Sequence, residues 1–288
     1  MAFCFTPEDS SLRAGFRRIA LERCSSAIAA LEDGAGPLDK RVHEARKSIK
    51  KLRALLRLTR PEFKRFRDEN RALRDTGRVL APLRDADVTA PLLAELGAEA
   101  GLGKAVLKRL RAELQATAAP GDAETRVAGA AAALIALADR IPSWRLDARG
   151  FDALSGGLCR SWDDAATAMR AALPAGGTLA IHDWRKRVKD HWYHARMLAP
   201  LWPEAMEPHV AAVGSLGDLL GRHQDLAVLE DRLGGTPEAL PVLALAARRR
   251  AALLAEAEPL ARRLWCEPGK SLARRWSAWW ETGGYPSR

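Results

Sequence analysis

Apolar side chains recur every three or four residues along most of the chain, which is the period of an α-helix. A clear example is the apolar arc formed by Val42, Ala45, Ile49, Leu52 and Leu56. β-Branched residues are sparse, and groups of Gly and Pro separate the periodic segments. The sequence therefore predicts an all-α protein.

The expected helices lie between these Gly- and Pro-containing breakers. In the first half of the chain they span residues 10–32, 38–60, 62–81, 86–98, 103–118 and 123–140. In the second half they span residues 149–173, 178–199, 204–221, 225–233, 237–264 and 268–281.

The two halves share sequence motifs in the same order. The segment VHEARKSIKKLRALLRL (42–58) resembles IHDWRKRVKDHWYHARML (181–198). Two shorter pairs keep the same spacing, namely LAPLRDADV with LGRHQDLAV and GFRR with GLCR. We therefore expect an internal repeat with two similar halves, residues 1–145 and 146–288.

Both repeated helices carry a stripe of cations directly beside the apolar arc. In the helix at 38–60 the stripe contains no acidic residue, whereas a solvated face usually mixes both signs. Like charges on neighbouring turns repel, so an anion is expected to compensate them, although a solvated face is the simpler alternative. The stripes consist of His43, Arg46, Lys47, Lys50, Arg53 and Arg57, and of His182, Arg185, Lys186, Lys189 and Arg196.

Charge composition agrees with an anionic partner. The 46 Lys and Arg exceed the 36 Asp and Glu, giving a formal net charge of +10 that favours nucleic acid, an anionic membrane or another polyanion. Cys4, Cys24, Cys159 and Cys266 have no metal-binding spacing, and we expect reduced, buried thiols. No long uncharged apolar run indicates a signal peptide or a membrane span, so a soluble cytoplasmic protein is expected.

The paired motifs V/I-H-x-x-R-K-x-x-K and L-x-x-x-R/Q-D-x-x-V resemble those of the CHAD domain, the conserved-histidine α-helical domain, over residues 8–282. The resemblance implies two pseudo-symmetric antiparallel four-helix bundles that enclose a basic channel, and binding of inorganic polyphosphate. It places the family histidines at His43 and His182. The basic positions that it implies are Arg17, Arg18, Arg46, Lys47, Lys50, Lys51, Arg53, Arg57, Arg160, Arg185, Lys186, Lys189 and Arg196.

The chain departs from the family pattern at Asp190 and Trp192, where the family often has a basic pair, so one wall of the channel is expected to be less cationic. Polyphosphate nevertheless suits the stripes on physical grounds. It is a flexible anion without bases, and a helix can present Arg and Lys side chains along successive phosphates. Binding should then depend on charge neutralisation.

The histidines and acids leave alternatives open. His43 and His182 are either phosphate donors or packed helical residues, and Asp85, Asp87 and Asp225 are more readily explained as caps or partners of arginine than as metal ligands. The pair His182-Asp183 resembles the His-Asp pair of metal phosphohydrolases. Adjacent residues of a helix point in different directions, however, so these two side chains are poorly placed to share one metal ion. His191 and His194 share a helix face without further ligands at suitable spacing. We expect no metal, no cofactor and no catalytic activity.

Aromatic residues test the nucleic-acid alternative. Trp184, Trp192 and Tyr193 lie on the second basic helix, while the first has none between residues 42 and 58. A single-strand site that spans both helices should stack bases on both, so nucleic acid is less favoured. Tyr193 is expected to line the channel. Tryptophans in the last helix, Trp276 and Trp280 among them, are expected to dock that helix rather than anchor a membrane.

These observations predict a non-catalytic protein that binds inorganic polyphosphate through cations of both repeats. Recruitment to polyphosphate granules and contact with granule proteins are extensions of that prediction. A binder of single-stranded nucleic acid or of polyanions in general is the first alternative. A metal-dependent hydrolase of polyphosphate or phosphate esters is the second.

Overall fold

The computed structural model describes residues 3–83, 89–115 and 122–287, and those residues form eleven α-helices, three short 3-10 helices and no strand. The predicted all-α class is confirmed. Of the described helices, none is long and apolar enough to cross a membrane.

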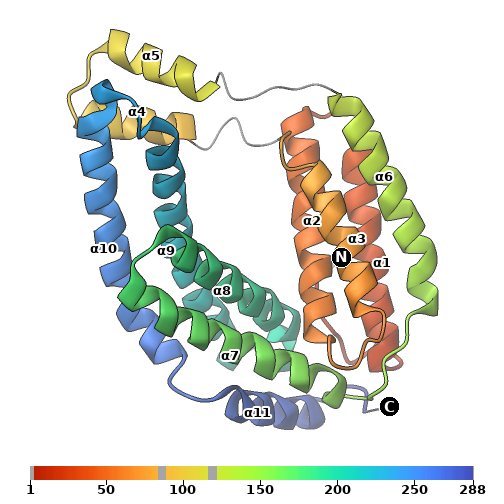
Figure 1. Ribbon diagram of the computed structural model, residues 1–288. Coiled ribbons are helices and arrows are strands. Elements are labelled where there is room, and N and C mark those ends of the chain that lie inside the picture. Colours follow the sequence, from red (N-terminus) through yellow and green to blue (C-terminus); the bar gives the residue numbers. More distant parts are fainter. Residues whose placement is uncertain (1–2, 84–88, 116–121, 288) are drawn as a thin grey trace.

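Four helices of the first half pack around a common core. They are α1 (Leu12–Glu32), α2 (Leu38–Leu58), α3 (Phe66–Val79) and α6 (Ala123–Arg140). In this arrangement α1 and α3 each contact both α2 and α6, as the right side of Figure 1 shows. Apolar positions three and four residues apart on α2 face the interior, because one stripe of an amphipathic helix must be buried.

The second half is built around α8. This helix (Thr178–Leu198) packs between α7 (Asp152–Ala175) and α9 (Pro203–Leu233). The remaining two helices cover the outside, α10 (Leu240–Leu264) along α9 and α11 (Gly269–Thr282) along α7.

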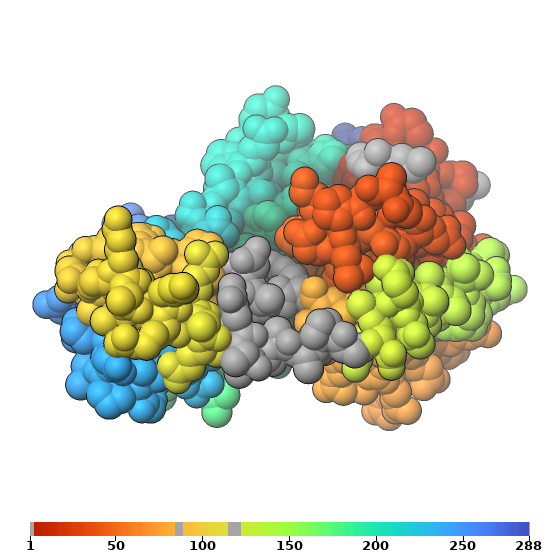
Figure 2. Space-filling view, turned by 90° about the horizontal axis from the view of Figure 1, so that it is seen from above, coloured from red at the N-terminus to blue at the C-terminus, as the bar shows by residue number. Residues whose placement is uncertain are grey.

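A helical hairpin from the first half packs against the second half. Its helices α4 (Thr89–Glu99) and α5 (Lys104–Gln115) contact α9, and α4 also contacts α10. Leu93 and Leu110 of the hairpin share a small apolar core with Leu229 and Val242. Seen from above in Figure 2, the hairpin lies over blue α10 and away from lime α6. Packing therefore crosses the expected division at residues 145 and 146.

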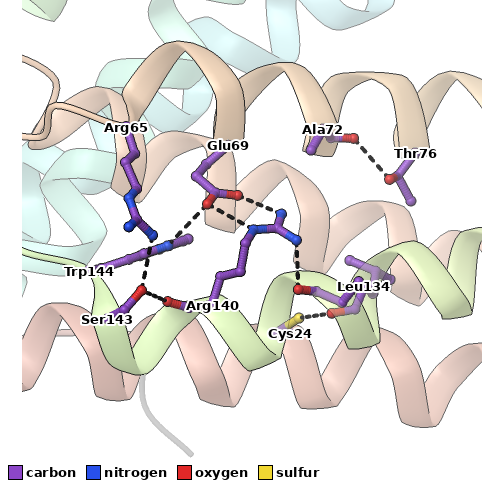
Figure 3. Close-up of polar contacts among 10 residues, drawn as sticks. Cys24, Arg65, Glu69, Ala72, Thr76, Leu134, Arg140, Ser143 and Trp144 are labelled. Atoms are coloured by element: carbon purple, nitrogen blue, oxygen red, sulfur yellow. Dashed lines mark hydrogen bonds and ion pairs between the residues drawn. The ribbon is translucent and has the colours of Figure 1, made fainter.

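An ion pair whose carboxylate is buried joins α3 to α6 in the first bundle (Figure 3). The Arg140 guanidinium donates to both carboxylate oxygens of Glu69, at 3.0 and 2.8 Å, and Trp144 Nε1 donates to the same carboxylate at 3.4 Å. Since Glu69 is only 3% exposed, its charge requires these partners. The contacts hold α3 against α6.

Two sequence predictions about local structure are wrong. The helices expected at 204–221 and 225–233 form one continuous helix, α9, because Gly221 packs beside Arg185 and does not interrupt the helix. The thiols are not uniformly buried, since Cys266 is exposed and Cys159 is half-buried. Docking of the last helix is confirmed, because Trp276 and Trp280 are buried.

The two halves meet at a close helix crossing between α2 and α7. A β-carbon at Gly157 would lie 1.8 Å from the carbonyl oxygen of Leu58, so only glycine fits. Beside this point, His194 Nε2 lies 2.9 Å from the carbonyl oxygen of Ala54, and its Nδ1 lies 2.9 Å from Ser161 Oγ. Because a carbonyl only accepts, Nε2 carries the proton. These five residues are called the seam.

The seam generates a stability prediction. Gly157→Ala should lower the free energy of unfolding by about 3 kcal/mol, because backbone atoms cannot move away from the new methyl group. Gly156→Ala is the matched control. There the new carbon meets only the Pro61 ring, 3.0 Å away, and the helix propensity gained is about 1 kcal/mol. Urea denaturation of both variants provides the comparison, and equal stabilities would contradict the importance of the crossing.

Candidate polyanion-binding groove

A groove of about 670 Å³ lies between α2, α3 and α8. Ten cationic side chains and two acidic side chains line it among the described residues. The cations are Arg46, Lys50, Arg53, Arg57, Arg74, Arg78, Arg185, Lys186, Arg187 and Lys189, and the acids are Asp183 and Asp190.

On the α2 wall, the arginines are held by contacts to α3. Arg46 Nη1 donates to the carbonyl oxygen of Gly77 at 3.2 Å, and Arg53 Nε donates to Asn70 Oδ1 at 3.1 Å. Burial, and then the nearby charge of Arg57, lower the pKa of Arg53 to about 10. Arg53 therefore remains a cation at neutral pH.

On the α8 wall, long cationic side chains lie against glycines of α9. A β-carbon at Gly217 would come within 3.0 Å of the Lys189 side chain, and one at Gly221 within 3.5 Å of the Arg185 guanidinium. The glycine face of α9 thus provides the space in which these side chains run along the helix surface. Lys189 Nζ is also 4.5 Å from the centre of the Trp192 ring, a cation–π contact that restricts its position.

Part of the positive charge is compensated within the protein. Arg57 Nη1 donates to Asp190 Oδ1 at 2.8 Å, across the groove from α2 to α8. Lys189 Nζ donates to Asp218 Oδ1 at 3.1 Å, and Asp218 is 75% exposed. Exposed pairs of the second kind contribute little and are screened by salt, whereas the first pair is mostly buried.

The sequence-predicted site residues separate into two groups. Those that line the groove are Arg46, Lys50, Arg53, Arg57, Arg185, Lys186, Lys189 and Tyr193. Those outside its lining are Arg17, Arg18, His43, Lys47, Lys51, Arg160, His182 and Arg196.

Arg17 and Arg18 have structural contacts on α1. Arg17 donates to the carbonyl oxygen of Trp144 at 2.8 and 2.6 Å, which ties α1 to the segment after α6. Arg18 pairs with Asp9 at 2.7 Å and donates to the carbonyl oxygen of Cys4, so it connects the N-terminal segment to α1. Arg160 is exposed on α7.

The other cations outside the lining lie on α2 and α8 themselves. Lys47 pairs with Glu44 at 3.3 Å, and Arg196 lies 4.7 Å from the centre of the Trp192 ring. Lys51 lies 5.4 Å from the centre of the Phe3 ring, and burial, followed by the charge of Arg23, lowers its pKa.

The two family histidines differ in environment. His43 is 49% exposed, with Nε2 3.9 Å from Glu44. His182 is half-buried, and burial together with Lys186 and Arg185 lowers its pKa, so the imidazole is neutral at pH 7. Neither lines the groove, although a neutral imidazole keeps one N–H donor.

His191 and His194 belong to the core. His191 Nε2 lies 2.9 Å from His209 Nε2, and His194 belongs to the seam. Burial lowers the pKa of His194 to about 3. In the part of the chain that the structure describes, no three His, Cys, Asp or Glu residues are grouped as metal ligands.

The acids near the repeated motif are only partly described. Asp85 and Asp87 lie outside the described residues. Asp225 lies within α9, so it does not begin a helix, as the range expected at 225–233 implied. The reason is the continuity of α9 through the glycine-containing segment that precedes it.

Sequence reasoning missed contributors from outside the two repeated helices. Arg74 and Arg78 reach the groove from α3, and Asp75 pairs with both, at 3.0 and 3.7 Å. The sequence signal that could have identified Arg74 and Arg78 is their spacing of four residues, which places both on one face of a helix. The spacing of Gly214, Gly217 and Gly221 likewise places them on one helix face, where the lack of side chains allows close packing.

Comparison with known proteins gives consistent results. The family model described as the CHAD domain matches residues 19–234. The fold resembles PptA from Streptomyces chartreusis, with 17% identity, a TM-score of 0.60, and coverage of 90% of this chain and 100% of that one. It also resembles the CHAD domain from the plant Ricinus communis, with 18% identity, a TM-score of 0.56, and coverage of 95% and 94%.

A search of curated proteins found no match. The family model nevertheless spans most of this chain, including both repeated basic helices and the groove between them. The all-helical fold agrees with that of the solved CHAD domain structure. The chain therefore belongs to the CHAD domain family.

Proposed function

We propose that this protein binds inorganic polyphosphate in the groove between α2, α3 and α8 and does not cleave it. The observation that carries the proposal is the convergence of ten described cations from three helices on one groove that contains two acids. The CHAD family is associated with polyphosphate binding. Like charges held this close favour a ligand that neutralises several of them together.

The length of the groove favours a polymer over a single phosphate. Arg46 and Arg57 are eleven residues apart on α2, which corresponds to about 16 Å along the helix axis. Several phosphates of an extended chain fit this length. Lys186 and Lys189 on the facing helix can contact the same chain from the other side.

The lining is less suited to nucleic acid. Tyr193 is the one aromatic residue among the described lining residues, and Trp192 is already in contact with Lys189 and Arg196. Base stacking on aromatic rings usually contributes much of the affinity for single strands. A ligand of phosphates alone needs no such contact.

The acids of the groove support a binding role rather than a catalytic one. Asp190 is paired with Arg57, and Asp183 lies 3.6 Å from Arg187. A carboxylate held by an arginine is a weak candidate for a general base or a metal ligand. Through this binding, the protein would be recruited to polyphosphate granules in the cytoplasm.

The first prediction concerns ligand and salt. Long-chain polyphosphate should bind far more tightly than orthophosphate or single-stranded DNA, and its affinity should fall by about a thousandfold between about 50 and 200 mM salt, because counterions are released on binding. Isothermal titration calorimetry at several salt concentrations measures this. Affinity that is independent of salt, or equal affinity for single-stranded DNA, would contradict the proposal.

The second prediction compares two lysines on α2. Lys50→Glu, in the groove lining, should weaken polyphosphate binding by roughly ten- to a hundredfold, because one charge-assisted contact becomes a repulsion. Lys47→Glu is the matched control, since the same charge change occurs three residues away and outside the lining. Its effect should be clearly smaller. Equal losses would indicate a general charge effect, and loss of helix in circular dichroism would assign Lys50 a structural role.

The third prediction concerns catalysis. Incubation with Mg²⁺ or Mn²⁺ should leave the chain length of polyphosphate unchanged on a gel, because both acidic residues of the described lining, Asp183 and Asp190, are paired with arginines. Binding should persist in EDTA, since Lys and Arg supply the positive charge. Metal-dependent release of phosphate that is lost in an Asp183→Asn variant would support a hydrolase instead.

A further inference from the structure

Asp190 occupies a particular position in the groove. It lies on α8, yet its Oδ1 accepts a hydrogen bond of 2.8 Å from Arg57 of α2, so the pair connects the two walls. The side chains of Asp190 and Arg57 are 16% and 28% exposed. This carboxylate is therefore a mostly buried anion within a binding site for anions.

Three arginines act on this carboxylate. Burial raises the pKa of Asp190, and the charges of Arg57, Arg187 and Arg53, in decreasing order, lower it by less. All three arginines line the groove. The name arginine cluster is used for Arg53, Arg57 and Arg187 around Asp190.

Without Asp190, the arginine cluster would suit a small phosphate. Guanidinium groups bind phosphate oxygens through paired hydrogen bonds, and several of them around one anion give high affinity. Asp190 takes this place as a carboxylate tethered to the protein. A tethered group competes at a high effective concentration, so a short anion must displace it to reach Arg57.

A long chain depends less on the arginine cluster. It can contact Arg46 and Lys50 on one wall and Lys186 on the other while Asp190 stays paired. Its affinity is the sum of many such contacts, each of moderate strength. Occupation of the cluster therefore weakens short phosphates more than long ones.

We propose that Asp190 is a specificity-determining residue, which fills the arginine cluster and thereby makes the groove selective for long polyphosphate over short phosphates. This inference rests on the proposed function. The contact between Arg57 and Asp190 then has two consequences, since it keeps Asp190 in the cluster and connects α2 to α8.

The test compares Asp190→Asn with the wild type, using tripolyphosphate and long-chain polyphosphate at one salt concentration. Tripolyphosphate affinity should increase on the order of tenfold, because Arg57 loses its carboxylate partner and becomes accessible to the ligand. Long-chain affinity should increase by a smaller factor, so the ratio of long-chain affinity to tripolyphosphate affinity falls. An unchanged ratio would contradict the inference.

Two further variants separate selectivity from stability. Asp218→Asn removes the exposed partner of Lys189, which causes the same change of net charge, and should leave the ratio close to the wild-type value. The double variant Arg57→Gln with Asp190→Asn removes both members of the buried pair, so no unpaired charge remains if the single variant does not fold. It should keep the wild-type ratio. A reduced ratio in the double variant would show that competition for Arg57 is not the cause.

The outcomes also distinguish this inference from the proposed function. Wild-type binding of long-chain polyphosphate tests the function, whereas the ratio between ligands in Asp190→Asn tests the inference. If the wild type bound long-chain polyphosphate and Asp190→Asn kept the wild-type ratio, the proposed function would stand and the role of Asp190 would be wrong.

Discussion

The approach of α7 to α2 at Gly157 is the constraint on which the groove depends. Backbone meets backbone there, and His194 of α8 is hydrogen-bonded to α2 through the carbonyl oxygen of Ala54. The seam therefore fixes α8 relative to α2 at one end of the groove. Cations on the two helices would otherwise separate to reduce their repulsion. Buried apolar packing on both sides of the seam offsets that repulsion.

Preorganised charge explains how the groove can bind without large rearrangement. Arg46 and Arg53 are held by Gly77 and Asn70 of α3, and Lys189 is held by the Trp192 ring. Restricting these side chains before binding lowers the entropy that a ligand must offset. The two acids of the described lining compensate only part of this charge in the free protein, and the role proposed for Asp190 is to limit which anions compete for Arg57.

Sequence periodicity was sufficient to predict most of the helices but not their tertiary contacts. Helix α6 has the bounds predicted from the sequence, since its apolar spacing is regular and its ends are marked. The continuity of α9 was not predicted, because Gly221 was interpreted as a helix end although glycine inside a helix costs only about 1 kcal/mol. The Arg57–Asp190 pair joins residues that are 133 positions apart, and helical spacing carries no information about such pairs. Likewise, only the packing of α3 on α2 brings Arg74 and Arg78 to the groove.

The central claim is that one polyphosphate chain lies between the walls formed by α2 and α8. A crystal structure of the protein with bound polyphosphate tests it most directly. The account predicts a row of phosphates in the groove, in contact with Lys50 of α2 and Lys186 of α8 at the same time, with Asp190 still paired to Arg57. A chain bound to the outer surface of a single helix, with the groove unoccupied, would contradict it.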